Sequence, residues 1–146
     1  MLRRPSRAWA ASGVLLTVVA TAAAGCGGGT SSPPGRVVDV TERDFRISVS
    51  ETHLRAGTVV FRAHNVGPDA HELIVVRTDG GRLRLRADGM TVDEEGLRRS
   101  IVGTLEAANA GAVRELSVRL RPGRYALFCN MSGHYMGGME ATVVVA

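Results

Sequence analysis

The sequence is short of several residue types, and each shortage narrows what it can encode. It contains two cysteines in 146 residues and no lysine, so every fixed positive side chain is an arginine. Its longest apolar stretch ends at Ala24 and is shorter than the ~18 residues that indicate a transmembrane helix. Two cysteines allow one disulfide at most, and we do not expect that bond, because Cys26 and Cys129 each lie in a motif with another role.

The formal net charge of +4 overstates how basic the protein is. Three of the 18 arginines precede residue 26, and residues 26–146 carry 15 arginines against 14 acidic side chains. A charge this close to balance gives no electrostatic footprint for nucleic acid. We therefore expect no nucleic-acid partner.

Residues 1–25 are typical of a bacterial export signal. Arginines precede an apolar core, and small residues lead up to Cys26. This end resembles a lipobox, in which cleavage leaves a diacylated N-terminal cysteine, although Ala23 stands where the motif usually has leucine. We expect lipidation at Cys26; the alternative is an ordinary secretory signal with a chance cysteine. The sequence leaves open whether export uses the general secretory or the twin-arginine route.

Residues 26–35 are rich in Gly, Ser and Pro and contain too little apolar surface to order themselves. We interpret them as a flexible tether between a lipid anchor and a domain that spans residues 36–146. About 110 residues suffice for one small domain with its own core. The expected location is the outer face of the bacterial cytoplasmic membrane.

Short apolar runs separated by turn residues predict an all-β domain, a sandwich or a barrel. The expected strands are Val37–Thr41, Phe45–Val49, Thr58–His64, Glu72–Arg77, Arg82–Arg86, Arg114–Leu120, Tyr125–Cys129 and Glu140–Val145. In the last three, apolar residues alternate with polar ones, which marks one buried face. By this rule the thiol of Cys129 points inward, as does Met139 at the start of the last strand.

One segment departs from the strand pattern. Thr91-Val92-Asp93-Glu94 matches a capping box, with Thr91 as the N-cap residue and a glutamate three positions later. We expect a short helix from this point to about Ile101.

Cys129, His134 and Met139 lie within eleven residues near the C-terminus, in a loop with three glycines that let the backbone turn sharply. Soft sulfur ligands combined with imidazole favour copper over magnesium, calcium or manganese. Two histidines and a cysteine in one plane, with a weak axial methionine, form a blue-copper electron-transfer site. Each residue type alone is more often structural, but this combination predicts a metal centre.

The sequence offers alternatives for the methionine ligand and for the second histidine ligand. Met131 and Met136 are also within reach, but Met139 is favoured because it starts the final strand on the inward face. The second histidine is ambiguous from the residues alone, because His64 and His71 flank the same turn at residues 65–70. His53 lies in a connecting segment and is expected at the surface.

Three stretches resemble the cupredoxins, the small blue copper proteins that include plastocyanin, azurin, auracyanin and rusticyanin. They are residues 57–73, the turn at 121–125, and Cys129-x4-His134-x4-Met139 at the spacing of the rusticyanin-like branch. The resemblance implies a Greek-key β-sandwich, here with one short inserted helix. It also implies that copper is bound by His71, the histidine after the Asn-x-Gly turn, together with Cys129, His134 and Met139.

The match has two departures. Several cupredoxins have asparagine directly after the first histidine, and this chain has Glu72, which leaves open whether Asn130 or backbone amides donate to the Cys129 sulfur. Residues 80–109 match only loosely.

The leading hypothesis is a one-electron carrier whose partners are haem proteins or a membrane oxidase complex, and we expect a monomer. Electrons would pass through His134 within an apolar patch of Met131, Met136, Gly137, Gly138 and Pro68. Delivery or buffering of copper outside the membrane is the alternative, with the same ligands. We do not expect an enzyme, because a second copper site would need more histidines than the four present, which include no His-x-His pair. A cupredoxin-like fold without metal is disfavoured by the intact ligand set.

Overall fold

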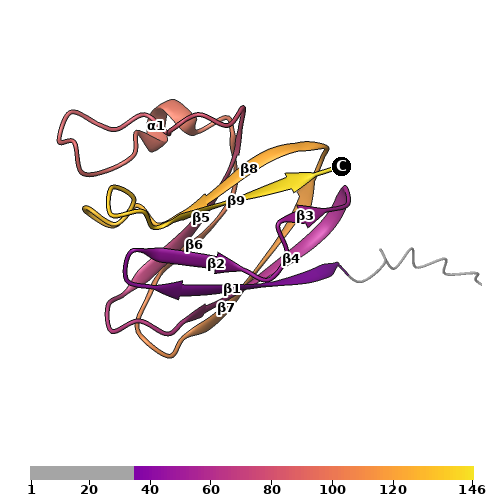
Figure 1. The fold of residues 1–146 in the computed structure, drawn as a ribbon, viewed down its shortest axis with the longest axis horizontal. Helices are drawn as coiled ribbons and strands as arrows, with labels where there is room; N and C mark the ends of the chain where they lie inside the picture. The colour runs from indigo at the N-terminus through magenta and orange to yellow at the C-terminus, as the bar shows by residue number, and fades with distance from the viewer. Residues whose placement is uncertain (1–34) are drawn as a thin grey trace, which may run out of the picture. The chain divides into compact units, whose positions relative to one another are not determined.

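The computed structural model describes residues 35–146, which form two β-sheets packed as a sandwich (Figure 1). The all-β expectation is confirmed. The predicted signal peptide, Cys26 and the tether up to residue 34 lie outside the described residues. No helix within residues 35–146 has the length and hydropathy needed to span a membrane.

The first sheet has four strands in the order β2-β1-β4-β7. β1 pairs in parallel with β4, whereas β2 and β7 pair antiparallel with their neighbours. The strands are β1 (Arg36–Arg43), β2 (Arg46–Val49), β4 (Gly57–Asn65) and β7 (Val113–Leu120). Alternate residues of these strands face the other sheet, as a half-buried strand requires.

The second sheet has five strands in the order β3-β9-β8-β5-β6. Only the short β3 pairs in parallel, with β9. The strands are β3 (His53–Leu54), β5 (His71–Thr78), β6 (Ile101–Ala108), β8 (Gly123–Phe128) and β9 (Glu140–Val145).

The central strands of this sheet are buried on both faces. In β5, Leu73 and Val75 belong to the core between the sheets, whereas Ile74 and Val76 belong to a second apolar cluster on the outer face. Residues 79–100 cover that outer face. The continuous apolar run of β5 is therefore explained by burial on two sides rather than one.

Two expectations about this covering segment are wrong. Residues Arg82–Arg86 form no strand; they contribute an isolated bridge between Leu85 and Val92. The helix is shorter than expected, α1 (Glu94–Leu97), and it starts later because Asp93, not Thr91, is its N-cap and accepts a hydrogen bond from the Gly96 amide. The Thr91 hydroxyl instead donates to Asp88.

The sequence pattern predicts no strand at β6, and the expected helix overlaps only the first residue of that strand, Ile101. Its sequence combines strand-favouring Ile101, Val102 and Thr104 with Gly103, Glu106 and two alanines, so its intrinsic strand propensity is mixed. Pairing with β5 provides the order that local preference does not. The missed β3 is only two residues long.

Three connections meet at one end of the sandwich, where the loop between β8 and β9 is drawn in yellow (Figure 1). They are the β1–β2 turn, the β4–β5 turn and the β8–β9 loop. Ring contacts join them: Phe45 and His71 each pack against His134, with centroids 5.4 Å and 5.2 Å apart. The fold thus brings residues from distant parts of the sequence to one site.

Candidate metal centre

His71, Cys129 and His134 form a compact group of possible metal ligands. One ligand atom from each lies within 4.8 Å of the others. Met139 is fully buried, and its amide donates to the His134 carbonyl over 3.0 Å. His64 and His53 are exposed, on β4 and β3, and do not join the group.

His71 has one nitrogen engaged and one free. Its ring is fully buried, and Nε2 lies 3.0 Å from Oδ1 of Asp44. Nδ1 has no hydrogen-bond partner among the described residues. An unpaired buried nitrogen is costly unless something binds it. Because Asp44 accepts from Nε2–H, the lone pair of Nδ1 is left available for a metal.

The turn before His71 is held by Asn65. Its side-chain Nδ2 donates to the carbonyls of Asp69 and Ala108, at 2.7 Å and 3.0 Å, and its Oδ1 accepts from the Gly67 amide. Gly67 lies so close that an added Cβ would be 2.7 Å from Asp44 Oδ1 and 3.0 Å from His71 Nε2. A side chain at position 67 would therefore displace the Asp44–His71 pair.

Cys129 is a buried, unpaired thiol at the end of β8. Burial raises the pKa of the Cys129 thiol, and hydrogen bonds from the backbone amides of Glu72 and Met131 act in the opposite direction. Those two amides answer the question left by the sequence, because the Asn130 side chain is engaged elsewhere. A deprotonated sulfur would find two donors already in place.

His134 faces the thiol from the middle of the loop. Its Nδ1 lies 3.5 Å from Cys129 Sγ. Burial lowers the pKa of His134, the neighbouring His71 lowers it further, and Asp69 and Asp44 oppose the change. A neutral imidazole is the form that can bind a metal.

Phe45 packs beside His134 in an unusual backbone conformation. Its φ of 59° is the single positive value for a non-glycine residue within 35–146. Such a conformation costs about 1–3 kcal/mol and is often found at functional sites. The ring also lies against Gly137, where an added Cβ would overlap with Phe45 Cδ1. The strained turn thus places an aromatic ring, 51% exposed, at the edge of the site.

The covering segment 79–100 is tied to the loop by two side chains. Asn130 Oδ1 accepts from the Val92 amide, and its Nδ2 donates to the Val92 carbonyl and to Glu94, at 2.5, 3.1 and 2.6 Å respectively. The Tyr135 hydroxyl accepts from the Leu83 amide over 2.9 Å. These bonds restrict the residues on both sides of His134.

Glu72 takes the position where several cupredoxins have asparagine. Its carboxylate accepts a hydrogen bond from the Asn130 amide over 2.9 Å. Burial raises the pKa of Glu72, and this hydrogen bond opposes the rise. Glu72 thereby joins the start of β5 to the end of β8.

The structure places three of the four predicted ligands, His71, Cys129 and His134, within 4.8 Å of one another, and Met139 is buried in the same core cluster as Cys129. Two imidazoles, one thiol and a nearby thioether are donor groups that fit copper. The predicted apolar patch around His134 needs one correction, because Met131 is half-buried and packs against the main core, whereas Met136 is 43% exposed. Sequence reasoning missed Asp44 and Phe45. Nothing in the local sequence distinguishes them, since their role depends on a turn that meets the site only in the folded chain.

Comparisons with known proteins agree with this fold. No family model matches the chain, and no curated protein matches it in sequence. Solved structures do match. They include a reduced auracyanin from Roseiflexus castenholzii, with 20% identity, a TM-score of 0.60, and coverage of 77% of this chain and 98% of that one.

Two further structures are similar at comparable levels. Auracyanin A from Chloroflexus aurantiacus, described as a "blue" copper protein, has 22% identity, a TM-score of 0.57, and coverage of 75% and 98%. Rusticyanin from Thiobacillus ferrooxidans has 15% identity, a TM-score of 0.56, and coverage of 77% and 79%. Residues 35–146 therefore have the cupredoxin fold.

Proposed function

We propose that this protein binds one copper ion and carries single electrons. The observation that carries the proposal is the free Nδ1 of the buried His71, which lies beside the Cys129 thiol and His134. A buried imidazole nitrogen with no partner among the described residues is poorly explained by packing alone. The cupredoxin fold and its copper-protein neighbours support this proposal.

His71, Cys129, His134 and Met139 would hold the ion. Copper in such a site supplies one-electron oxidation and reduction between Cu(II) and Cu(I). The surrounding residues position the proposed ligands. Asp44 orients His71, the amides of Glu72 and Met131 donate to the Cys129 sulfur, and Asn130 restrains the loop. A rigid pocket limits the rearrangement that accompanies each change of charge.

His134 is the part of the site nearest to solvent, since its side chain is half-exposed while His71, Cys129 and Met139 are fully buried. Three exposed apolar side chains lie near it: Phe45 packs against its ring, Met90 lies beside Gly133, and Met136 follows it by two positions. We call these three residues the rim. A small apolar contact of this kind suits brief encounters with redox partners. Electrons would enter and leave through His134.

The proposed setting is outside the cytoplasmic membrane, with lipid on Cys26 as the anchor. The signal-like residues 1–25 support this proposal, and haem proteins or a membrane oxidase complex are the proposed partners. Absence of a lipid-modified fragment in mass spectrometry of membrane fractions would contradict the anchor and leave the copper proposal untouched.

A copper titration tests the metal centre. Adding Cu(II) to the purified protein should produce an intense visible charge-transfer band, which a reductant bleaches. His71→Ala should abolish this band, while the matched variant His64→Ala should keep it, because His64 is exposed and outside the group. A colourless protein, or loss of the band with His64→Ala alone, would overturn the assignment.

A second assay separates electron carriage from copper delivery. A carrier holds copper through many turnovers, and the full burial of three of the four proposed ligands supports slow release. After repeated oxidation and reduction in the presence of a copper chelator, the coloured band should persist. Rapid transfer of copper to the chelator would favour delivery.

A further inference from the structure

A groove lies on the outer side of the second sheet, between residues 78–84, α1 and the start of β8. Its volume is about 640 Å³. Four arginines line it against a single carboxylate, Asp79; they are Arg77, Arg82, Arg84 and Arg124. We call these four residues the arginine groove. The domain as a whole carries almost no net charge. The excess of four arginines over one carboxylate therefore concentrates positive potential on one face.

The charges of the groove are not neutralised within the domain. The ion pairs found among residues 35–146 use other arginines: Arg36, Arg62, Arg98 and Arg114. Arg77 donates to the Pro122 carbonyl over 2.9 Å, which positions its guanidinium without cancelling its charge. The groove therefore retains positive charge that an external anion can neutralise.

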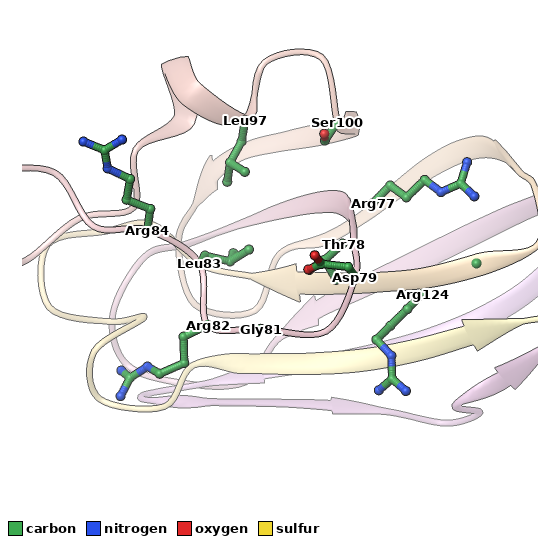
Figure 2. Close-up of a pocket in the computed structure, with 11 residues that line it drawn as sticks. Arg77, Thr78, Asp79, Gly81, Arg82, Leu83, Arg84, Leu97, Ser100 and Arg124 are labelled. Carbon is green, nitrogen blue, oxygen red and sulfur yellow. The ribbon is translucent and has the colours of Figure 1, made fainter.

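The arrangement of the side chains indicates the size of that anion. In Figure 2, Arg82 and Arg84 extend from one side of the groove, while Arg77 and Arg124 extend from the other, and their guanidinium groups diverge. Between them lie Thr78 and Asp79. Groups that diverge in this way do not converge on one small ion. They match several carboxylates spread over a surface.

The groove adjoins the rim around His134. Arg82 Nη2 lies 3.8 Å from the sulfur of Met136, which is exposed and follows His134 by two positions. A partner protein whose surface pairs with Arg82 therefore lies next to the rim. This continuity favours a redox partner over a membrane surface as the occupant of the groove.

We propose that the arginine groove docks the acidic surface of a redox partner and thereby orients that partner over His134. This inference rests on the proposed function, because the docked protein is a redox partner only if this protein carries electrons. Arginine fork groups pair with carboxylates through two parallel hydrogen bonds. Charges beside a docking site act mainly on association rate and are screened by salt.

The test uses a fluorescent poly-glutamate peptide as the acidic probe. The double variant Arg82→Glu/Arg84→Glu is compared with Arg55→Glu/Arg119→Glu, which changes net charge equally at exposed arginines outside the groove. At an ionic strength of about 0.02 M, the groove variant should bind the peptide on the order of tenfold more weakly. The control should match the unmodified protein, and binding should weaken at about 0.15 M salt.

Amide signals in NMR locate the probe: residues 81–84 and 133–139 should both shift on peptide addition. Equal weakening in the two double variants, or shifts confined to other parts of the domain, would overturn the proposal. So would a groove variant that loses binding to phosphatidylglycerol vesicles while keeping peptide binding, since that result would assign the groove to lipid. Peptide binding needs no copper, so failure of the copper titration is a separate outcome.

Discussion

Asp44 and His71 are joined by a hydrogen bond of 3.0 Å between a carboxylate oxygen and Nε2, at the point where the β1–β2 turn meets the start of β5. The aspartate is partly exposed and the histidine is fully buried. A carboxylate on the outer nitrogen of a metal-binding histidine fixes its tautomer and raises its basicity. The charge of Asp44 thus lies one ring away from the proposed ion.

We expect Asp44→Asn to raise the reduction potential, because the amide oxygen still accepts from Nε2–H while the negative charge that favours Cu(II) is lost. Asp44→Ala should also weaken copper binding, by about 10- to 100-fold. Redox titration at fixed pH and salt measures the first effect. Asp39→Asn is the control, because it removes the same charge from an exposed position on β1. An equal shift in both variants would show that Asp44 acts only through net charge.

Phe45 should limit access to His134. Replacing Phe45 with glycine removes the ring and relieves the left-handed strain, worth about 1–2 kcal/mol. We expect little loss of stability but faster removal of copper by a chelator, because His134 loses its aromatic cover. Phe45→Leu keeps an apolar side chain and should release copper at nearly the original rate. Identical release rates in all three proteins would show that the ring does not cover the site.

Much of the fold follows from local pattern, whereas the surroundings of the site do not. Alternation in β7, over Tyr125–Cys129 and on the inward face of β9 allowed correct prediction of these strands and of the buried positions of Cys129 and Met139. The four proposed ligands came from residue type, spacing and family resemblance. Asp44 could not be found this way, because it reaches the site through a turn whose position depends on the whole sandwich. For the same reason the sequence could not decide between Asn130 and backbone amides as donors to the Cys129 sulfur.

The covering segment shows a different reason for failure. Leu83 and Leu85 alternate like strand residues, yet they pack as a loop against Ile74 and Phe128 on the outer face of the second sheet. Local sequence cannot distinguish these two uses of the same pattern. The capping-box prediction failed similarly, because Asp88 competes for the Thr91 hydroxyl and Asp93 supplies the cap.

Asn130 should be the main attachment of this segment to the ligand loop. Asn130→Ala removes three hydrogen bonds and leaves the Val92 amide buried without its partner, which costs about 1–3 kcal/mol. We expect a lower urea midpoint for the metal-free protein and a broadened copper absorption band. Asn109→Ala, at an exposed asparagine before β7, is the control. A normal midpoint in Asn130→Ala would mean that the apolar cluster alone holds the segment.

Asp88 provides a pH-dependent contact in the same segment. Hydrogen bonds from the Met90 amide, the Thr91 hydroxyl and the Thr91 amide lower the pKa of Asp88. Because this pKa is lowered, the stabilisation is present above the ordinary aspartate pKa and is lost as pH falls through the lowered value. The NMR signals of both amides should therefore shift only in strongly acidic solution. Asp88→Asn should abolish that titration; its persistence would assign it to another group.

The buried pair Glu42–Arg114 should couple β1 to β7. Arg114 Nη2 donates to Glu42 Oε2 over 2.6 Å, while Glu42 Oε1 and Arg114 Nε have no partner among the described residues. Removing the arginine alone leaves a buried carboxylate uncompensated, so Arg114→Met should lower the free energy of unfolding by about 3–5 kcal/mol. The double variant Glu42→Gln/Arg114→Met should be more stable than Arg114→Met alone, because no buried charge remains. Urea unfolding of the metal-free proteins measures this double-mutant cycle, and strictly additive changes would show that the two side chains do not interact.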